Sequence, residues 1–261
     1  MEIGFFEKLW SMFCLRPYVF IPIVFFLYFG KRELGWVRTL FWLGVSYGIA
    51  FLSEFSSVRI GFPYGWYYYV KEPTKDLEFW ITNVPFMDSI SYVFLSYWAF
   101  TAARVLTGEA VFSSVKFPWR TWLVGAFVMM LADVVIDPVA LRGHRWFLGT
   151  IFGYPEWGPY FGIPLENFAG WFLVGLSIHG AMLILGRIFF KRFPEPKWEI
   201  FSPLLYIAIV TFNIFVALYL KEFWLFVCDL LIMIPLFFLI LKRLFPDKFL
   251  FFSYLKEQKS I

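Results

Sequence analysis

The sequence predicts an all-α integral membrane protein, a bundle of about seven transmembrane helices. Hydrophobic residues make up 61% of the 261 residues, and aromatic residues alone make up 25%. The mean hydropathy of +0.70 is far above that of a soluble domain. Windows of about 20 apolar residues, enough to cross a bilayer as a helix, recur along the chain. They are 15–30, 36–54, 84–106, 119–140, 165–188, 200–220 and 223–241.

The first predicted span is less distinct than the second and third. The first is the shortest and carries Arg16, Pro17 and Pro22 near its start. Because further spans follow it, we expect an anchored helix and not a cleaved signal peptide. The second span ends at Glu54, and the third reaches Asp88 about one turn after it begins. Both acidic residues are therefore expected near the outer boundary of the membrane.

The last four spans carry the other acidic residues. The fourth ends with Asp133 and Asp137, the fifth begins at Glu166, and the sixth is an apolar run around Asn213. The seventh places Asp229 about two turns below its start. Ionisable groups at membrane depth usually mark a functional site. Because all six carboxylates fall in the outer half, we expect one shared polar cavity that opens outward.

Lys and Arg predict the orientation of the chain. They are more numerous after spans one, three and five and in the carboxyl-terminal tail than in the other loops. The positive-inside rule places these segments in the cytoplasm. We expect a plasma-membrane protein in contact with lipid, with a cytoplasmic carboxyl terminus. Because the basic residues serve as an orientation signal, no nucleic-acid partner is expected.

Asp133 and Asp137 are the leading candidates for proton chemistry. Their i, i+4 spacing in LADVVIDPVA puts both carboxyls on one helix face. Like charges repel there, which favours the protonated form of one of them. A protonated carboxyl can act as a general acid, while an ionised neighbour can position water or stabilise a cation.

Helix ends divide the acidic residues into two groups. Asp137 and Glu54 are expected at carboxyl-terminal ends, where the helix dipole disfavours negative charge. Asp88 and Glu166 are expected in first turns, where negative charge is favoured. Taken singly, Glu54 and Glu166 fit ordinary interfacial charges equally well, and Asp137 before Pro138 fits a helix terminator.

Two other polar residues lie inside apolar spans. Asp229 needs a partner within the bundle, and Asn213 and Lys221 are the nearest candidates. His179 lies among small residues and is expected to be a packing histidine. The two cysteines form no CxxC motif and have no histidine at ligand spacing, so neither a disulfide framework nor a zinc site is indicated.

The outer loops, 55–83 and 141–164, are rich in aromatic residues, Gly and Pro, as in GFPYGWYYY and YPEWGPYFGIP. Repeated Gly and Pro predict fixed turns, so we expect a structured cap on a single transmembrane domain that covers 1–261. Aromatic faces suit a long conjugated or isoprenoid ligand, and their quadrupole can stabilise a carbocation.

These segments resemble a membrane-protein family of carotenoid biosynthesis that includes the carotenoid hydratases. The resemblance covers most of the chain. It is carried by the span end at Glu54, GFPYGWYYY, NVPFMDS around Asp88, DVVIDPVA, and EWGPYFGIPLENFAGWF. It implies addition of water to the terminal double bond of an acyclic C40 or C50 carotenoid end group. The product would be a tertiary alcohol, made without a redox cofactor.

The resemblance and the helix-end argument together assign roles to the candidate residues. Asp137, with Asp133 as its partner, would donate the proton and leave a tertiary cation that captures one water. Asp88, Glu166 and Glu54 would orient that water and balance charge. The expected substrate-binding residues are Trp66, Tyr68, Trp157, Tyr160, Asn167 and Trp171.

Three other functions compete with this interpretation. A carotenoid cyclase or related isoprenoid isomerase needs the same acid and aromatic walls but must exclude water. A non-catalytic carotenoid-binding or transport protein fits polar groups gathered on one side, although no inverted repeat is visible. A retinal photoreceptor needs a lysine within the last span, where Lys occurs only beyond the ends, at Lys221 and Lys242.

Overall fold

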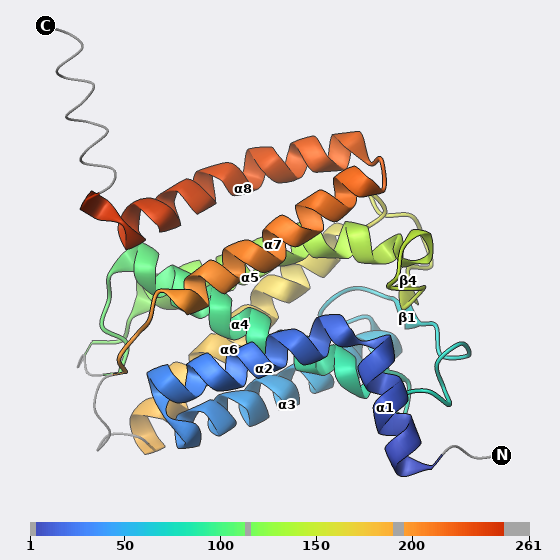
Figure 1. Ribbon diagram of the computed structural model, residues 1–261, viewed down its shortest axis with the longest axis horizontal. Helices are drawn as coiled ribbons and strands as arrows, with labels where there is room; N and C mark the ends of the chain where they lie inside the picture. Colours follow the sequence, from blue (N-terminus) through green and yellow to red (C-terminus); the bar gives the residue numbers. More distant parts are fainter. Residues whose placement is uncertain (1–3, 113–115, 190–195, 248–261) are drawn as a thin grey trace, which may run out of the picture.

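The structure, a computed structural model, describes residues 4–112, 116–189 and 196–247. Its helices run side by side, and short strands lie in loops at one end (Figure 1). The elements are α1 (Phe5–Leu15), α2 (Pro17–Leu34), α3 (Trp36–Ile60), β1 (Tyr68–Tyr69), β2 (Trp80–Ile81), β3 (Val84–Pro85), α4 (Phe86–Thr107), α5 (Trp119–Leu141), the 3-10 turn η1 (Gly143–Arg145), β4 (Phe152–Gly153), α6 (Leu165–Phe189), α7 (Phe201–Tyr219) and α8 (Phe223–Leu244). Each of the seven predicted spans coincides with one helix, α2 to α8.

Helix α1 was not expected, and it meets α2 at a bend of 92°. The break falls at Arg16 because the residue before a proline is disfavoured in helical conformation, whereas Pro17 suits the first position of α2. The guanidinium of Arg16 is buried and donates to both carboxylate oxygens of Glu78, at 3.0 and 2.7 Å. This ion pair joins the bend to the loop before β2.

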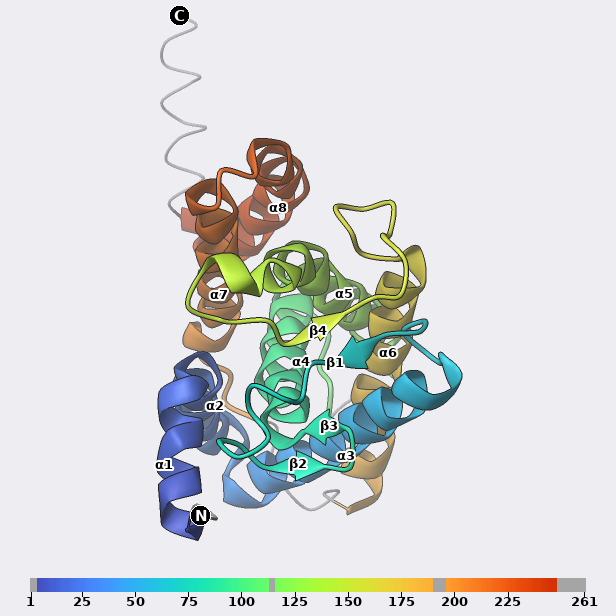
Figure 2. The ribbon, with the colours of Figure 1, turned by 90° about the vertical axis from the view of Figure 1, so that its right-hand side faces the viewer.

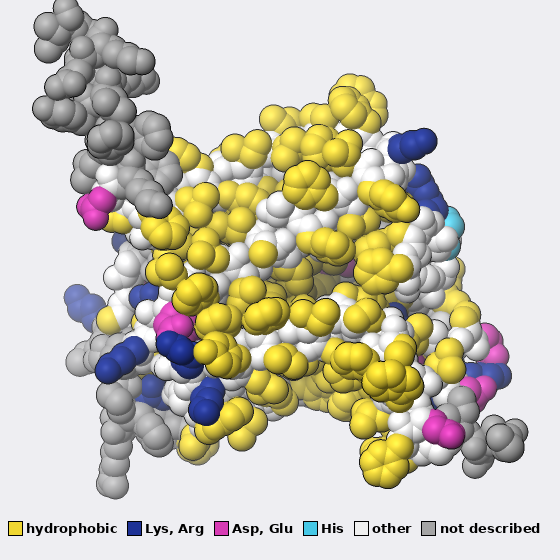
Figure 3. Space-filling view, in the orientation of Figure 1, with side chains coloured by type: hydrophobic (Ala, Val, Ile, Leu, Met, Phe, Trp, Pro, Cys, Tyr) yellow, Lys and Arg dark blue, Asp and Glu magenta, His cyan; other side chains and the backbone are white. Residues whose placement is uncertain are grey.

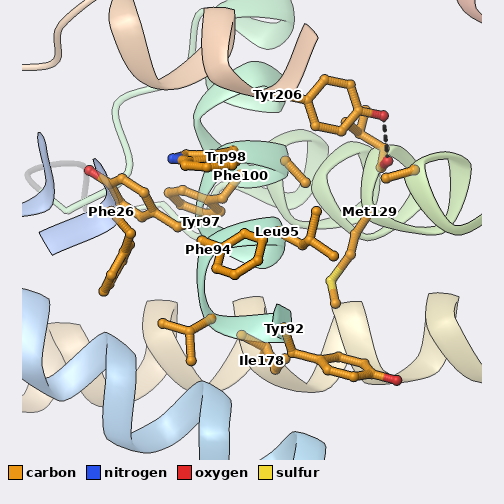
Figure 4. Packing of buried hydrophobic residues seen from close by; sticks show 14 of the residues in the cluster. Phe26, Tyr92, Phe94, Leu95, Tyr97, Trp98, Phe100, Met129, Ile178 and Tyr206 are labelled. Atoms are coloured by element: carbon orange, nitrogen blue, oxygen red, sulfur yellow. Dashed lines mark hydrogen bonds between the residues drawn. The ribbon is translucent and has the colours of Figure 1, made fainter. Parts of the chain in front are cut away.

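Helix α4 forms the centre of the bundle. It packs against α2, α3, α5, α6, α7 and α8, and apolar and aromatic side chains leave it in every direction (Figure 4). Tyr97, for example, meets Phe26 of α2 edge-on, with ring centroids 5.2 Å apart. A helix surrounded in this way is buried on all faces, and its amino-terminal end brings Asp88 into the interior.

The two aromatic loops join over one end of the bundle, which faces the viewer in Figure 2. Strand β1 pairs with β4 in antiparallel register, and the amide of Val70 donates to the carbonyl of Ile151 at 2.8 Å. A β-hairpin pairs β2 with β3. The loops therefore form a structured cap, as their Gly and Pro content predicted.

The protein's surface has the character of a membrane protein, but the predicted count of about seven crossings is not confirmed. Among the described residues, four helices, α5 to α8, are long and apolar enough to cross a membrane. The bent pair α1 and α2 brings the number to five. Hydrophobic side chains cover the middle of the face in Figure 3, and charged residues gather toward its ends. The tail 248–261, predicted to be cytoplasmic, lies outside the described residues.

Candidate active site

A cavity of about 600 Å³ lies beneath the cap. Its walls come from α2, α4, α5, α6 and α7, and both aromatic loops contribute to it. Most of the lining is apolar or aromatic, and Asp88 and Asp137 are the acidic residues among the lining side chains. Two of the predicted carboxylates therefore reach one cavity from different helices.

Asp88 belongs to the first of two carboxyl pairs. The hydroxyl of Tyr69 lies between Asp88 Oδ2 and Glu54 Oε1, with hydrogen bonds to both and a distance of 2.9 Å to Glu54. Ser89 donates to the other oxygen of Glu54, which is fully buried on α3. A phenol carries one proton, so both contacts are satisfied together only when one of the two carboxyls is protonated.

Asp133 and Asp137 form the second pair on α5. The side-chain amide of Asn167 donates to Asp133 Oδ2 and to Asp137 Oδ2, each at 2.8 Å. Asp133 is buried, whereas Asp137 faces the cavity. The two carboxyls therefore lie on one face of α5, as their i, i+4 spacing predicted, and the amide of Asn167 on α6 contacts both. A pair of carboxyls held this close can share one proton.

Loop tyrosines connect the cap to these pairs. Tyr67 donates to the hydroxyl of Tyr69 at 3.3 Å. Burial, followed by the nearby charge of Asp88, raises the pKa of Tyr69 well above its ordinary value. Burial and the neighbouring Asp137 do the same to the pKa of Tyr154, which also lines the cavity. These phenols therefore keep their protons and act as donors at neutral pH.

An aromatic wall faces the carboxyl pairs. Tyr92 of α4 and Trp171 of α6 stack with centroids 4.3 Å apart and planes 10° apart, and Tyr64 of the first loop lies against both rings. The close approach of this loop to α6 depends on Gly170. A Cβ on this residue would lie 2.6 Å from Tyr64 Cδ1 and 2.7 Å from the carbonyl oxygen of Pro63.

The expectation that all six carboxylates share one cavity is wrong for Glu166. This residue is exposed and lies beside a separate, smaller hollow together with Trp66 and Trp157. Its neighbour Asn167 points into the main cavity instead. Successive helical side chains diverge by about 100°, so the fifth span presents Asn167 and not Glu166 to the site.

The predicted substrate-binding residues divide in the same way. Trp171 and Asn167 line the main cavity, whereas Trp66, Tyr68 and Trp157 are more than half exposed at the surface of the cap. Tyr160 is half-buried and packs in a side cluster with Val139 and Leu225, outside the main cavity.

Asp229 is also absent from the cavity lining. It is fully buried on α8, and neither of its carboxyl oxygens has a hydrogen-bond partner among the described residues. The expected partner Asn213 donates instead to the carbonyl of Ile209, at 2.9 Å. His179 is a packing histidine, as expected. It is fully buried, and its Nε2 lies 2.9 Å from the carbonyl oxygen of Ser96.

The predicted positions of the acidic residues relative to helix ends are confirmed only in part. Asp88 is in the first turn of α4, but α3 continues to Ile60, so Glu54 lies inside that helix. The dipole effect is confined to the last turn and does not distinguish Glu54. Helix α5 runs through Pro138 to Leu141, so Asp137 does not terminate it.

The sequence reasoning missed Tyr69, although the GFPYGWYYY segment was identified. Alternate side chains of an extended strand point to opposite faces, so Tyr67 and Tyr69 share the inner face and Tyr68 takes the outer one. That period was the signal that could have found Tyr69. Among the described residues, no group of three His, Cys, Asp or Glu side chains is placed to hold a metal ion.

Comparison with known proteins places the chain in a family. The family model described as "Carotenoid biosynthesis protein" matches residues 13–239. The chain belongs to this family. It is also similar to a bisanhydrobacterioruberin hydratase of Haloarcula japonica, with 31% identity over 130 residues. That match covers 50% of this chain but only 38% of the relative. No solved structure matches the chain.

Proposed function

We propose that this protein is a carotenoid hydratase, a lyase that adds water to the terminal double bond of an acyclic end group on a C40 or C50 carotenoid. The observation that carries the proposal is the placement of Asp88 and Asp137, each backed by a second carboxyl, in one apolar and aromatic cavity. Membership of a carotenoid biosynthesis family and the similarity to a hydratase support it.

In the proposed reaction, Asp137 is the general acid. Its proton is transferred to the less substituted carbon of the double bond, whose π electrons form the new C–H bond. The tertiary carbon is left as a cation. Asp137 is left as a carboxylate that accepts a hydrogen bond from Asn167. Asp133, held beside it by the same amide and itself protonated, limits the local negative charge. An acid positioned in this way accelerates proton transfer by about 100-fold to 10,000-fold.

Water then captures the cation. Its oxygen supplies the electron pair for the new C–O bond, and its surplus proton is transferred to the pair formed by Asp88 and Glu54. Tyr69 bridges that pair and keeps it oriented. The proton must return to Asp137 before the next cycle, so the net reaction consumes only water and alkene.

The aromatic wall is suited to stabilise the tertiary cation formed in the proposed reaction. Stacked Tyr92 and Trp171 offer flat apolar faces to the end group, and ring faces attract a nearby positive charge. Glu166 lies outside this cavity, so we give it no part in the reaction. We also propose that the protein lies in the plasma membrane, among lipid, with its carboxyl terminus in the cytoplasm.

The direct test is isotopic. Membranes containing the protein are incubated with an acyclic-ended carotenoid in water enriched in heavy oxygen, and the products are analysed by mass spectrometry. We expect a tertiary alcohol that carries the label. A product of unchanged mass would support the cyclase or isomerase alternative, and recovery of bound, unaltered pigment would support a binding protein.

Replacement of single carboxyls tests the assignment of roles. Asp137→Asn and Asp133→Asn should lower hydration by about 100-fold or more, with the elution profile and helical circular dichroism of the parent. Asp88→Asn should instead divert the cation toward isomerised alkene, because the acceptor for the water proton is lost. Full hydration by both Asp133→Asn and Asp137→Asn would rule out this assignment.

A further inference from the structure

The cavity has a side opening between α2 and α7. These helices lie next to each other in front of α4 (Figure 1) and barely contact one another. Figure 3, in the same orientation, shows a hollow between them in the middle of the apolar face, with acidic atoms visible inside. The opening therefore faces the region where lipid would surround the protein.

Five side chains define the rim of this opening. Ile21 and Phe25 of α2 are 56% and 43% exposed, and Phe212 and Ala208 of α7 are exposed as well. Phe147 of the second aromatic loop, 60% exposed, completes the rim at the end nearest the cap. All five nevertheless line the cavity. A residue that is exposed at the outer surface and also lines the interior cavity lies where the two meet. The rim is wholly apolar, in contrast to the carboxyl pairs beyond it.

The cap lies over the end of the cavity that holds the carboxyl pairs. Pairing of β1 with β4, extended by the bond from Val70 to Ile151, ties the two loops together above the carboxyls. A water-insoluble polyene would in any case arrive through the bilayer. An apolar side opening is therefore the route that fits both the fold and the ligand.

The cavity is too short for a whole carotenoid. Along α4 its lining extends from Asp88 to Trp98, ten residues or about 15 Å of helix. An extended C40 polyene is about as long as the hydrocarbon core of a bilayer, about 30 Å. Roughly half of the polyene must remain outside.

We propose that the protein admits one end of a linear polyene sideways between α2 and α7, and leaves the rest of the polyene in the lipid. This inference rests on the proposed function and extends it to the class of substrate. Recognition is limited to the terminal isoprenoid units, so polyenes with different far ends are accepted. A carotenoid with two acyclic ends must leave and return for the second hydration, and the singly hydrated product accumulates first.

The first test narrows the opening. Ile21→Trp and Ala208→Trp place bulk on the rim, and Val24→Trp is the matched control, because Val24 is equally exposed on α2 but does not line the cavity. Each variant is assayed with a linear carotenoid and with a ten-carbon alkene that has the same trisubstituted end. We expect the ratio of carotenoid to short-alkene hydration to fall about tenfold in the rim variants and to stay at the parent value in Val24→Trp. An unchanged ratio in both rim variants would overturn the proposal.

The second test is independent of turnover and of these substitutions. A photoreactive benzoylphenylalanine replaces Phe212 on the rim, or Phe215 as a control that is exposed on α7 but outside the cavity. Both are placed in the Asp137→Asn background with carotenoid in the membrane. We expect cross-linked pigment at 212 above the level at 215, and equal yields at the two positions would contradict a side opening. If the parent hydrates neither substrate, the proposed reaction fails, while the cross-link still decides whether a polyene lies between α2 and α7.

Discussion

At the scale of single residues, the hydroxyl of Tyr69 bridges the two carboxyls of one pair. It contacts Glu54 and Asp88, which come from different helices, and it receives a hydrogen bond from Tyr67. Without this bridge, the carboxyls of Glu54 and Asp88 would face each other with Ser89 as the one side-chain donor among the described residues. A buried acid that loses its donor is costly, so this loop residue matters for stability and for the site.

Tyr69→Phe tests this role. Loss of a hydrogen bond to a carboxylate costs about 1.5 to 3 kcal/mol, so we expect a lower melting temperature in detergent together with reduced hydration. Tyr68→Phe is the matched control, because Tyr68 belongs to the same strand but is 53% exposed. Equal behaviour of the two variants in both assays would exclude the bridge from the function.

At the scale of elements, the site depends on the close contact between the first aromatic loop and α6. Gly170 leaves room for Tyr64 and for the backbone at Pro63. The adjacent Trp171 stacks on Tyr92, and Asn167 holds the carboxyls of α5. One turn of α6 therefore sets both the aromatic wall and the acid pair, and displacement of that turn should disturb both.

Gly170→Ala should displace the loop. The added Cβ meets atoms at 2.6 and 2.7 Å, and overpacking of this kind costs about 1 to 3 kcal/mol. We expect a lower melting temperature and weaker hydration. Gly48→Ala on α3 adds the same methyl group where nothing lies within 4 Å, so it should be neutral or slightly stabilising. A Gly170→Ala protein as stable and active as the Gly48→Ala protein would refute the packing argument.

At the scale of the whole molecule, the number of helices that cross the membrane decides on which side of the membrane the cap and the cavity lie. Helices α5 to α8 are apolar enough to cross, whereas α3 and α4 fall short of the same criterion. Helix α4 contains three Ser, two Tyr and two Thr but is enclosed by six other helices. Such shielding removes the need for an apolar surface, so its composition does not prevent a crossing.

Cysteine labelling tests the topology. In a chain with Cys14 and Cys228 replaced by Ala, single cysteines are introduced at Lys31, in the last turn of α2, and at Glu72, in the cap. Both positions are exposed. If α3 crosses the membrane and the cap lies outside, as the Lys and Arg distribution predicts, a membrane-impermeant maleimide labels position 72 in intact cells. Position 31 is then labelled only after permeabilisation. Labelling of both positions from the same side would mean that α3 does not cross.

The sequence by itself determined helices α2 to α8 and one half of the candidate site. Seven apolar windows located α2 to α8, because a run of apolar residues long enough to span lipid has few alternatives to a helix. The i, i+4 spacing placed Asp133 and Asp137 on one face, because that relation is local to a single helix.

Only the tertiary structure decided which other groups join them. The rotation of α6 selects Asn167 over Glu166, and the path of the cap selects Tyr69 over Tyr68. Packing around α4 brings Glu54 to Asp88 and leaves the opening beside α7. These outcomes depend on how whole helices and loops pack against one another, and no local spacing along the chain encodes that packing.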